Sequence, residues 1–168
     1  KDRRFDTENF FYTGFSYGAG QVNKSVDIRT DFKSTPWRAV AAAEPGCNVI
    51  SEPVKVSFPI LMIKGSESHY YVEPCQYFAR LLKSAGVSVE LDVIEGANHF
   101  FSTDGRIVRG KAVNGCRFNP VIRKKDRFEF ADGSPATLQI IRQKCFTKMG
   151  GAGKNRLLLD GVIERVLD

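Results

Sequence analysis

The stretch that decides the fold is Gly14-Phe15-Ser16-Tyr17-Gly18, which directly follows the apolar run Asn9-Phe10-Phe11-Tyr12-Thr13. A strand that ends in G-x-S-x-G and turns at once into small residues is typical of a nucleophile elbow. The central residue of an elbow lies in a strained turn, so the residues two positions away on each side should lack bulky side chains. The amide of the next residue, Tyr17, then points to where an oxyanion would form. The pattern alone also fits an ordinary serine in a turn after a strand.

Composition bounds the class of protein. The chain has 168 residues, of which 42% are hydrophobic and 26% are charged, as in one globular domain. No run approaches the roughly 18 apolar residues of a membrane-spanning helix, so we expect no membrane span. The net charge is +6, with the densest basic cluster at Arg123-Lys124-Lys125-Asp126-Arg127. This cluster lacks the interleaved aromatic residues of many nucleic-acid sites, so we expect a solvated face and no nucleic-acid partner.

The four cysteines are Cys47, Cys75, Cys116 and Cys145. They form no C-x-x-C pair and no zinc-ligand spacing, so we expect no metal site. Cys116 and Cys145 fall in the turn-rich final third, where a disulfide would stabilise a segment with little core. Such a bond favours an oxidising compartment, periplasmic or secreted. Four reduced thiols in a cytoplasmic protein are the alternative.

The first hundred residues alternate between strand and helix, and several strands are apolar enough for burial on both faces. That pattern predicts an α/β fold with a mostly parallel sheet and flanking helices. The expected strands cover residues 9–13, 37–43, 56–63 and 87–94, and the expected helices cover 18–28 and 72–85. Farther along, residues 127–133 suggest a hairpin or tight turn, and 155–167 predict a packing helix.

A serine nucleophile needs a base, and the chain has two histidines, His69 and His99. His99 lies in a turn after the last apolar strand. The chain order of nucleophile, acid and histidine is the order that accompanies a G-x-S-x-G elbow. We therefore predict Ser16 as the nucleophile and His99 as the base.

Four segments together resemble the C-terminal half of a dienelactone hydrolase-like α/β-hydrolase. They are the elbow, the strand Pro59-Ile60-Leu61-Met62-Ile63 leading into Lys64-Gly65, the helix segment Cys75-Gln76-Tyr77-Phe78-Ala79 with Ala85-Gly86-Val87, and the turn Glu95-Gly96-Ala97-Asn98-His99-Phe100-Phe101. The resemblance implies hydrolysis of small-molecule carboxylic ester or lactone bonds without metal or organic cofactor. It also implies a single α/β-hydrolase-like domain over residues 1–168, with a loop-rich added segment at 104–154, and an oxyanion contact from the Tyr17 amide.

The acid member of the triad is where the chain departs from the family. The family has an aspartate in the turn after the strand that ends at Ile63, and Ser68 stands at that position. A neutral serine would accept a hydrogen bond from His99 but would stabilise its imidazolium form poorly.

Two glutamates are candidates for the missing acid. Glu67 is adjacent to the family position, and Glu44 follows the expected strand 37–43. Neighbouring side chains tend to point apart, which weakens Glu67, but we rank it slightly above Glu44. His69 and Tyr70 are candidate binding residues, or simply part of a surface turn.

The start of the chain is the second departure from the family. In the family several strands precede the elbow strand, and one of their loops supplies a second oxyanion amide. Only residues 1–8 precede Asn9 here, so the elbow strand would leave a hydrophobic edge open. We therefore expect the chain to lack its N-terminal strands, with a missing N-terminal segment or a second chain covering that edge. A short sheet capped by residues 104–154 is the alternative.

The sequence thus predicts a serine hydrolase of carboxylic esters or lactones. A non-catalytic hydrolase-like binding module, or an inactive fragment of a larger protein, is the rival hypothesis. Saturable ligand binding without turnover, surviving Ser16→Ala, would favour the rival.

Overall fold

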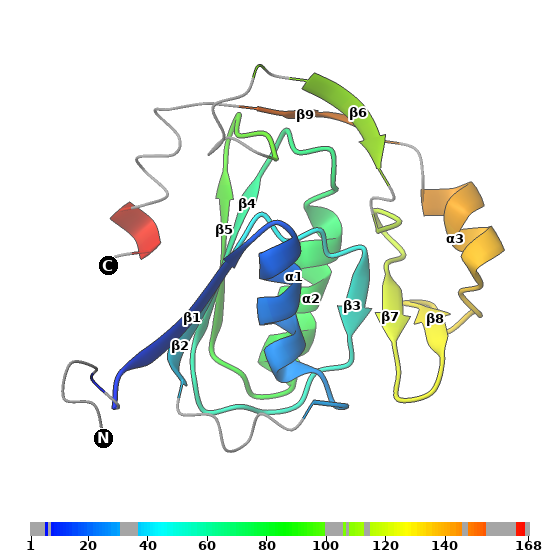
Figure 1. The fold of residues 1–168 in the computed structure, drawn as a ribbon. Helices are drawn as coiled ribbons and strands as arrows, with labels where there is room; N and C mark the ends of the chain where they lie inside the picture. The colour runs from blue at the N-terminus through cyan, green and yellow to red at the C-terminus, as the bar shows by residue number, and fades with distance from the viewer. Residues whose placement is uncertain are drawn as a thin grey trace.

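The computed structural model describes residues 6, 8–30, 37–99, 106, 108–112, 115–145, 148–153 and 164–166. Its centre is a four-stranded sheet in the order β1-β2-β4-β5, in which all neighbouring strands run parallel (Figure 1). These strands are Phe10–Phe15 (β1), Trp37–Ala43 (β2), Ile60–Gly65 (β4) and Val89–Ile94 (β5). The predicted α/β class with a mostly parallel sheet is confirmed.

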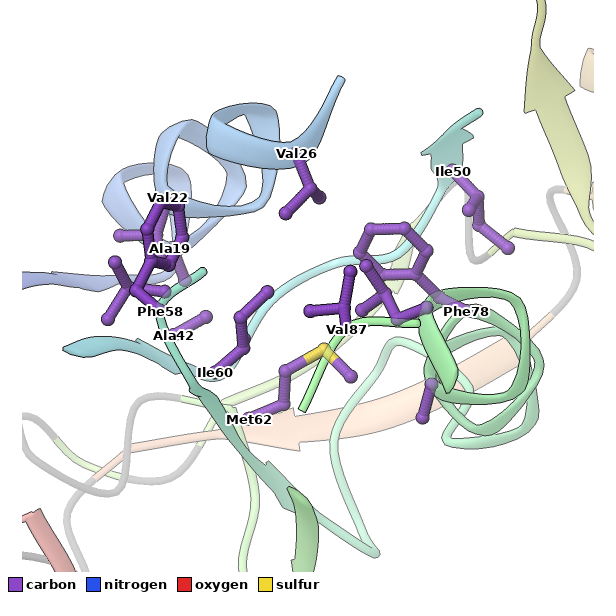
Figure 2. Close-up of a cluster of buried hydrophobic side chains, with 13 residues drawn as sticks. Ala19, Val22, Val26, Ala42, Ile50, Phe58, Ile60, Met62, Phe78 and Val87 are labelled. Atoms are coloured by element: carbon purple, nitrogen blue, oxygen red, sulfur yellow. The ribbon is translucent and has the colours of Figure 1, made fainter. Parts of the chain in front are cut away.

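Two helical segments cover one face of this sheet (Figure 1). They are α1, Tyr17–Asn23, continued by a 3-10 turn over Lys24–Val26 (η1), and α2, Glu73–Ser84. The main core lies between them and the sheet (Figure 2). Its buried side chains include Ala19, Val22 and Val26 from the first segment, Val40, Ala42, Ile60 and Met62 from the strands, and Phe78, Ala79 and Leu82 from α2.

The sequence explains the limits of α2 and β4. Apolar residues at three- and four-residue spacing place one face of α2 in the core, and Gly86, with φ +78°, follows its end. The strand predicted for residues 56–63 begins only at Ile60. Pro59 lacks an amide hydrogen for the ladder, and of the residues just before it Phe58 is buried in the core with Val56 packed against that core.

Two further small sheets are built mainly by the second half of the chain, and β3 joins one of them from the first half. One has the order β3-β7-β8, with strands Val49–Ser51, Val121–Arg123 and Phe128–Phe130, and the other pairs β6, Val108–Ala112, with β9, Lys148–Ala152. Helix α3, Leu138–Cys145, packs on the first of these. The tight turn predicted at 127–133 is confirmed, because the Gly133 amide donates to the Phe130 carbonyl at 2.9 Å. That residues 104–154 are an added segment stays a prediction.

Two disulfides fasten these parts. The predicted pair Cys116–Cys145 is present, and Cys47–Cys75, which we did not predict, joins the loop after β2 to α2.

Of the helix predicted for 155–167, only residues 164–166 lie within the described part, and they are helical. Throughout the described ranges, no helix has the length and apolar character needed to cross a bilayer.

Asp27 connects the end of the α1 segment to the second sheet. Its side chain is fully buried and accepts hydrogen bonds from Arg29 Nε at 2.9 Å and from Ser51 Oγ, in β3, at 2.8 Å. Burial opposes ionisation, but the hydrogen bonds from Arg29 and Ser51 outweigh it and lower the pKa of Asp27 to about 2. Arg123 of β7 adds a charge 3.6 Å from this carboxylate.

Candidate active site

Ser16 occupies the turn between β1 and α1 in a strained backbone conformation. Its φ of 54° and ψ of −111° are unusual for a residue with a side chain, and its amide donates to the Ala43 carbonyl at 2.9 Å. A Cβ added to Gly14 would lie 2.4 Å from the carbonyl carbon and oxygen of Gly18, whereas one added to Gly18 would meet nothing within 4 Å. The expected requirement for a bare backbone is therefore confirmed at Gly14 and wrong at Gly18.

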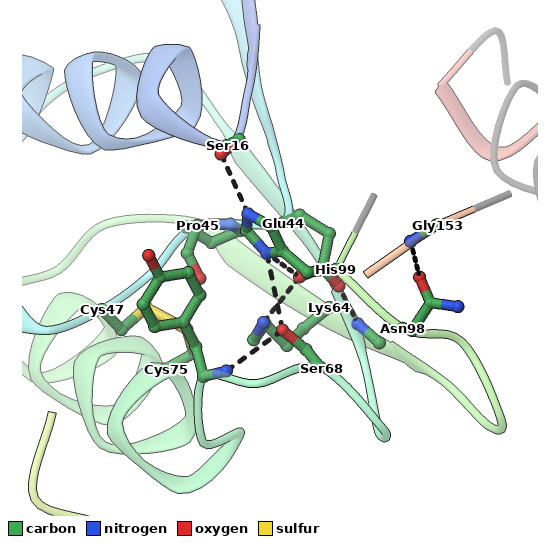
Figure 3. A network of polar contacts seen from close by, with 12 residues as sticks. Ser16, Glu44, Pro45, Cys47, Lys64, Ser68, Cys75, Asn98, His99 and Gly153 are labelled. Carbon is green, nitrogen blue, oxygen red and sulfur yellow. Dashed lines mark hydrogen bonds and ion pairs between the residues drawn. A yellow bond between two sulfur atoms is a disulfide. The ribbon is translucent and has the colours of Figure 1, made fainter. Parts of the chain in front are cut away.

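His99 joins the serine to a carboxylate (Figure 3). Its Nε2 lies 2.9 Å from Ser16 Oγ, and its Nδ1 lies 2.9 Å from Glu44 Oε2. His99 is 1% exposed and comes from the turn after β5. In the neutral tautomer whose Nδ1–H donates to Glu44, Nε2 carries no hydrogen and can accept the serine proton.

Glu44 follows β2 directly and is fully buried. Its Oε2 also accepts from Lys64 Nζ at 2.7 Å, and its Oε1 accepts from the Gly65 amide. Burial raises the pKa of this carboxyl, but the charge of Lys64 and the hydrogen bonds from His99, Lys64 and Gly65 bring the pKa below its ordinary value. The glutamate is therefore ionised and oriented toward His99.

The ranking of Glu67 above Glu44 is corrected by this geometry. Glu67 is exposed, and the carboxylate at His99 belongs to Glu44. Ser68, at the family's aspartate position, is buried with its Oγ 3.4 Å from His99 Nδ1. The available signal for Glu44 was its place at the carboxyl end of a strand next to the elbow strand. Lys64, in β4, was not recognised as part of the site.

Aromatic rings surround the histidine. The ring centroids of His69 and Tyr70 lie 4.6 Å and 4.9 Å from that of His99. Both residues belong to the turn after β4, and that they bind a ligand stays a prediction. Tyr17, the expected source of an oxyanion amide, is the first residue of α1, and its side chain is 82% exposed.

A cavity of about 330 Å³ opens beside Ser16 and His99. Tyr70 and Phe78 contribute rings to its wall, and Arg123 reaches it from the second sheet. A small organic molecule fits a space of this size.

Strand β9 holds the turns that carry the site. The His99 amide donates to the Gly151 carbonyl at 3.0 Å, and the Gly151 amide donates to the Glu67 carbonyl at 3.2 Å. The next contact is from the Gly153 amide to Asn98 Oδ1 at 3.0 Å (Figure 3). Residues 151–153 therefore hold the backbone of the turn that contains His99 in place.

No protein-family model and no curated protein matches the chain. Among solved structures it is similar to esterase PE8, with 20% identity, 54% of this chain and 42% of that chain covered, and a TM-score of 0.44. It is similar to Pyrococcus horikoshii acylaminoacyl peptidase, with 19% identity, 58% and 21% covered, and a TM-score of 0.44. It is also similar to Thermogutta terrifontis esterase 2, with 22% identity, 57% and 47% covered, and a TM-score of 0.45. The chain spans less than half the length of each of these proteins.

Proposed function

We propose that the chain is a serine hydrolase of the α/β-hydrolase type that cleaves carboxylic ester or lactone bonds. The observation that carries the proposal is the continuous series of contacts from Ser16 Oγ through both nitrogens of His99 to the buried carboxylate of Glu44. An exposed serine-histidine contact would be unremarkable, but a strained serine, a buried imidazole and a buried ionised glutamate in series match the requirements of nucleophilic catalysis.

Each member has a defined step in this proposal. Ser16 Oγ attacks the substrate carbonyl while His99 Nε2 takes its proton, and Glu44 stabilises the imidazolium that forms. The Tyr17 amide, at the start of α1, donates to the developing oxyanion. His99 returns the proton to the leaving alcohol oxygen, and water then releases the acyl group from Ser16 by the same steps. None of these steps needs a cofactor.

The test is covalent labelling by a fluorophosphonate, which reacts with activated serines. We expect the wild-type protein to be labelled and Ser16→Ala to be unlabelled. Ser84→Ala, an exposed serine at the end of α2, is the matched control and should label normally. A folded wild-type protein that resists the probe would contradict the proposal and favour a hydrolase-like binding module.

The finer assignment is to serine-bearing dienelactone hydrolase-like enzymes acting on small esters or lactones. The cavity beside Ser16 supports a small substrate, and the two disulfides favour an oxidising compartment. Strand β1 is an edge of its sheet in the described structure, and Phe11 on it is 67% exposed. We infer that a further segment or a second chain pairs there, and turnover by a longer form with a second oxyanion donor should exceed that of this chain.

A further inference from the structure

Lys64 is a buried cation that a serine-histidine-glutamate arrangement does not by itself require. Its side chain and that of Glu44 are both 0% exposed. Strands β2 and β4 pair in parallel with Ala43 opposite Ile63, so Glu44, just after β2, lies beside Lys64, which is still within β4. An ion pair removed from water is costly unless its geometry compensates the lost hydration. A lysine at this depth therefore needs a role beyond surface charge.

Lys64 and His99 share one oxygen of the carboxylate. Lys64 Nζ lies 2.7 Å and His99 Nδ1 lies 2.9 Å from Glu44 Oε2, while the Gly65 amide holds Oε1 (Figure 3). Burial alone would favour the neutral carboxyl group. A neutral Glu44 would not oppose the positive charge that develops on His99 during the reaction. The ammonium group of Lys64 therefore favours the ionised form of Glu44, which burial alone would disfavour.

We propose that Lys64 is a positioning residue that keeps Glu44 ionised and directed at Nδ1 of His99. This inference rests on the proposed function, because it depends on His99 being the base. Among the described residues, charged or titratable groups that also face this site include Tyr70 and His69 from the turn after β4, and Arg123 of β7, which lines the cavity beside His99. The Tyr70 ring centroid lies 5.7 Å from Lys64 Nζ, and the His69 ring lies 4.6 Å from the ring of His99.

The experiment compares Lys64→Met with Lys83→Met, which changes an exposed lysine in the last turn of α2. The readouts are the rate of fluorophosphonate labelling and the kcat and KM for p-nitrophenyl acetate, each followed across pH. In Lys64→Met we expect kcat and labelling to fall by about 10-fold to 100-fold at neutral pH, the size of loss typical when the hydrogen-bond partner that orients a metal ligand is removed. KM should change little, and the loss should shrink as pH rises, because Glu44 ionises at higher pH without its counter-charge. Lys83→Met should behave as wild type.

A Lys64→Met protein with the wild-type pH profile, or with a loss of equal size at every pH, would overturn the proposal. If Lys64→Met fails to fold, Glu44→Gln/Lys64→Met removes both charges together. A folded, poorly labelled double variant would support charge compensation, whereas failure of both to fold, or wild-type labelling of the double variant, would overturn it. An unlabelled wild-type protein would instead contradict the proposed function, so the two failures are distinguishable.

Discussion

Replacing Glu44 by glutamine tests the assignment of the acid. The carboxylate accepts from three donors, Lys64, His99 and the Gly65 amide. A glutamine has one oxygen and one NH₂ group, so in either orientation a donor faces a donor. If the oxygen remains toward His99, the NH₂ group opposes the Gly65 amide, and Lys64 still loses its counter-charge.

These losses set the expected magnitudes. Breaking one side of a buried ion pair typically costs about 3–5 kcal/mol of stability. Domains have roughly 5–15 kcal/mol available, so we expect Glu44→Gln to remain folded but to unfold at lower urea concentration. Because the neutral amide cannot stabilise the imidazolium, kcat should fall by roughly 10³-fold to 10⁴-fold, as in other triads that lose their acid.

The assay is p-nitrophenyl acetate turnover and fluorophosphonate labelling, with urea unfolding followed by circular dichroism. Glu67→Gln is the matched control, since Glu67 is exposed and was the rival candidate. It should keep wild-type activity and stability. Wild-type turnover in Glu44→Gln, or an equal loss in Glu67→Gln, would refute the assignment of Glu44.

Three further predictions concern the scaffold. Gly14→Ala should destabilise the fold by about 1–3 kcal/mol and abolish labelling, because its Cβ would overlap the backbone of Gly18. Gly18→Ala should label normally, and its free energy of unfolding should lie within about 0.5 kcal/mol of the wild-type value. Equal effects of the two variants in urea unfolding would contradict the close approach at Gly14. The pKa of Asp27 is lowered to about 2 from 3.8, so its contribution of about 2 kcal/mol is present above pH 4 and lost as pH falls through 2. The stability gap between wild type and Asp27→Asn should therefore close in acid, and a constant gap would count against it. Removing the Cys47–Cys75 disulfide with Cys47→Ala/Cys75→Ala should cost about 3–4 kcal/mol, since it closes a separation of 28 residues; an unchanged unfolding midpoint would show that the bond does not constrain the unfolded chain.

The sequence was most informative where a local pattern has one structural solution. Strand β2 matches the predicted run 37–43, because the run is apolar apart from Arg38 and is followed by Glu44-Pro45-Gly46. Ser16 and His99 were predictable as partners for a similar reason, because the G-x-S-x-G pattern and the order of the two residues along the chain are typical of a geometry that brings the side chains together, here to 2.9 Å.

The acid, the buried lysine and one disulfide depend on contacts that no local pattern encodes. Glu44 and Lys64 meet only because β2 and β4 pair with Ala43 opposite Ile63, and a shift of that register would separate them. Strand β3 is three residues long, too short for a periodic signal, and its partner β7 lies far along the chain. Cys47 and Cys75 likewise become neighbours only when α2 packs on the sheet.

The hydrogen bonds from β9 to the turns of Glu67 and His99 bear on how this protein could be shortened or fused. Three backbone or amide contacts pass through Gly151 and Gly153, and the Cys116–Cys145 disulfide fixes the chain just before that strand. A minimal version that stopped just after His99 would keep the side chains of Ser16, Glu44 and His99 while removing the hydrogen bonds from Gly151 and Gly153 to the turns that hold Glu67 and His99. A tag or partner domain fused at this strand would therefore disturb the backbone that holds His99 in the candidate site.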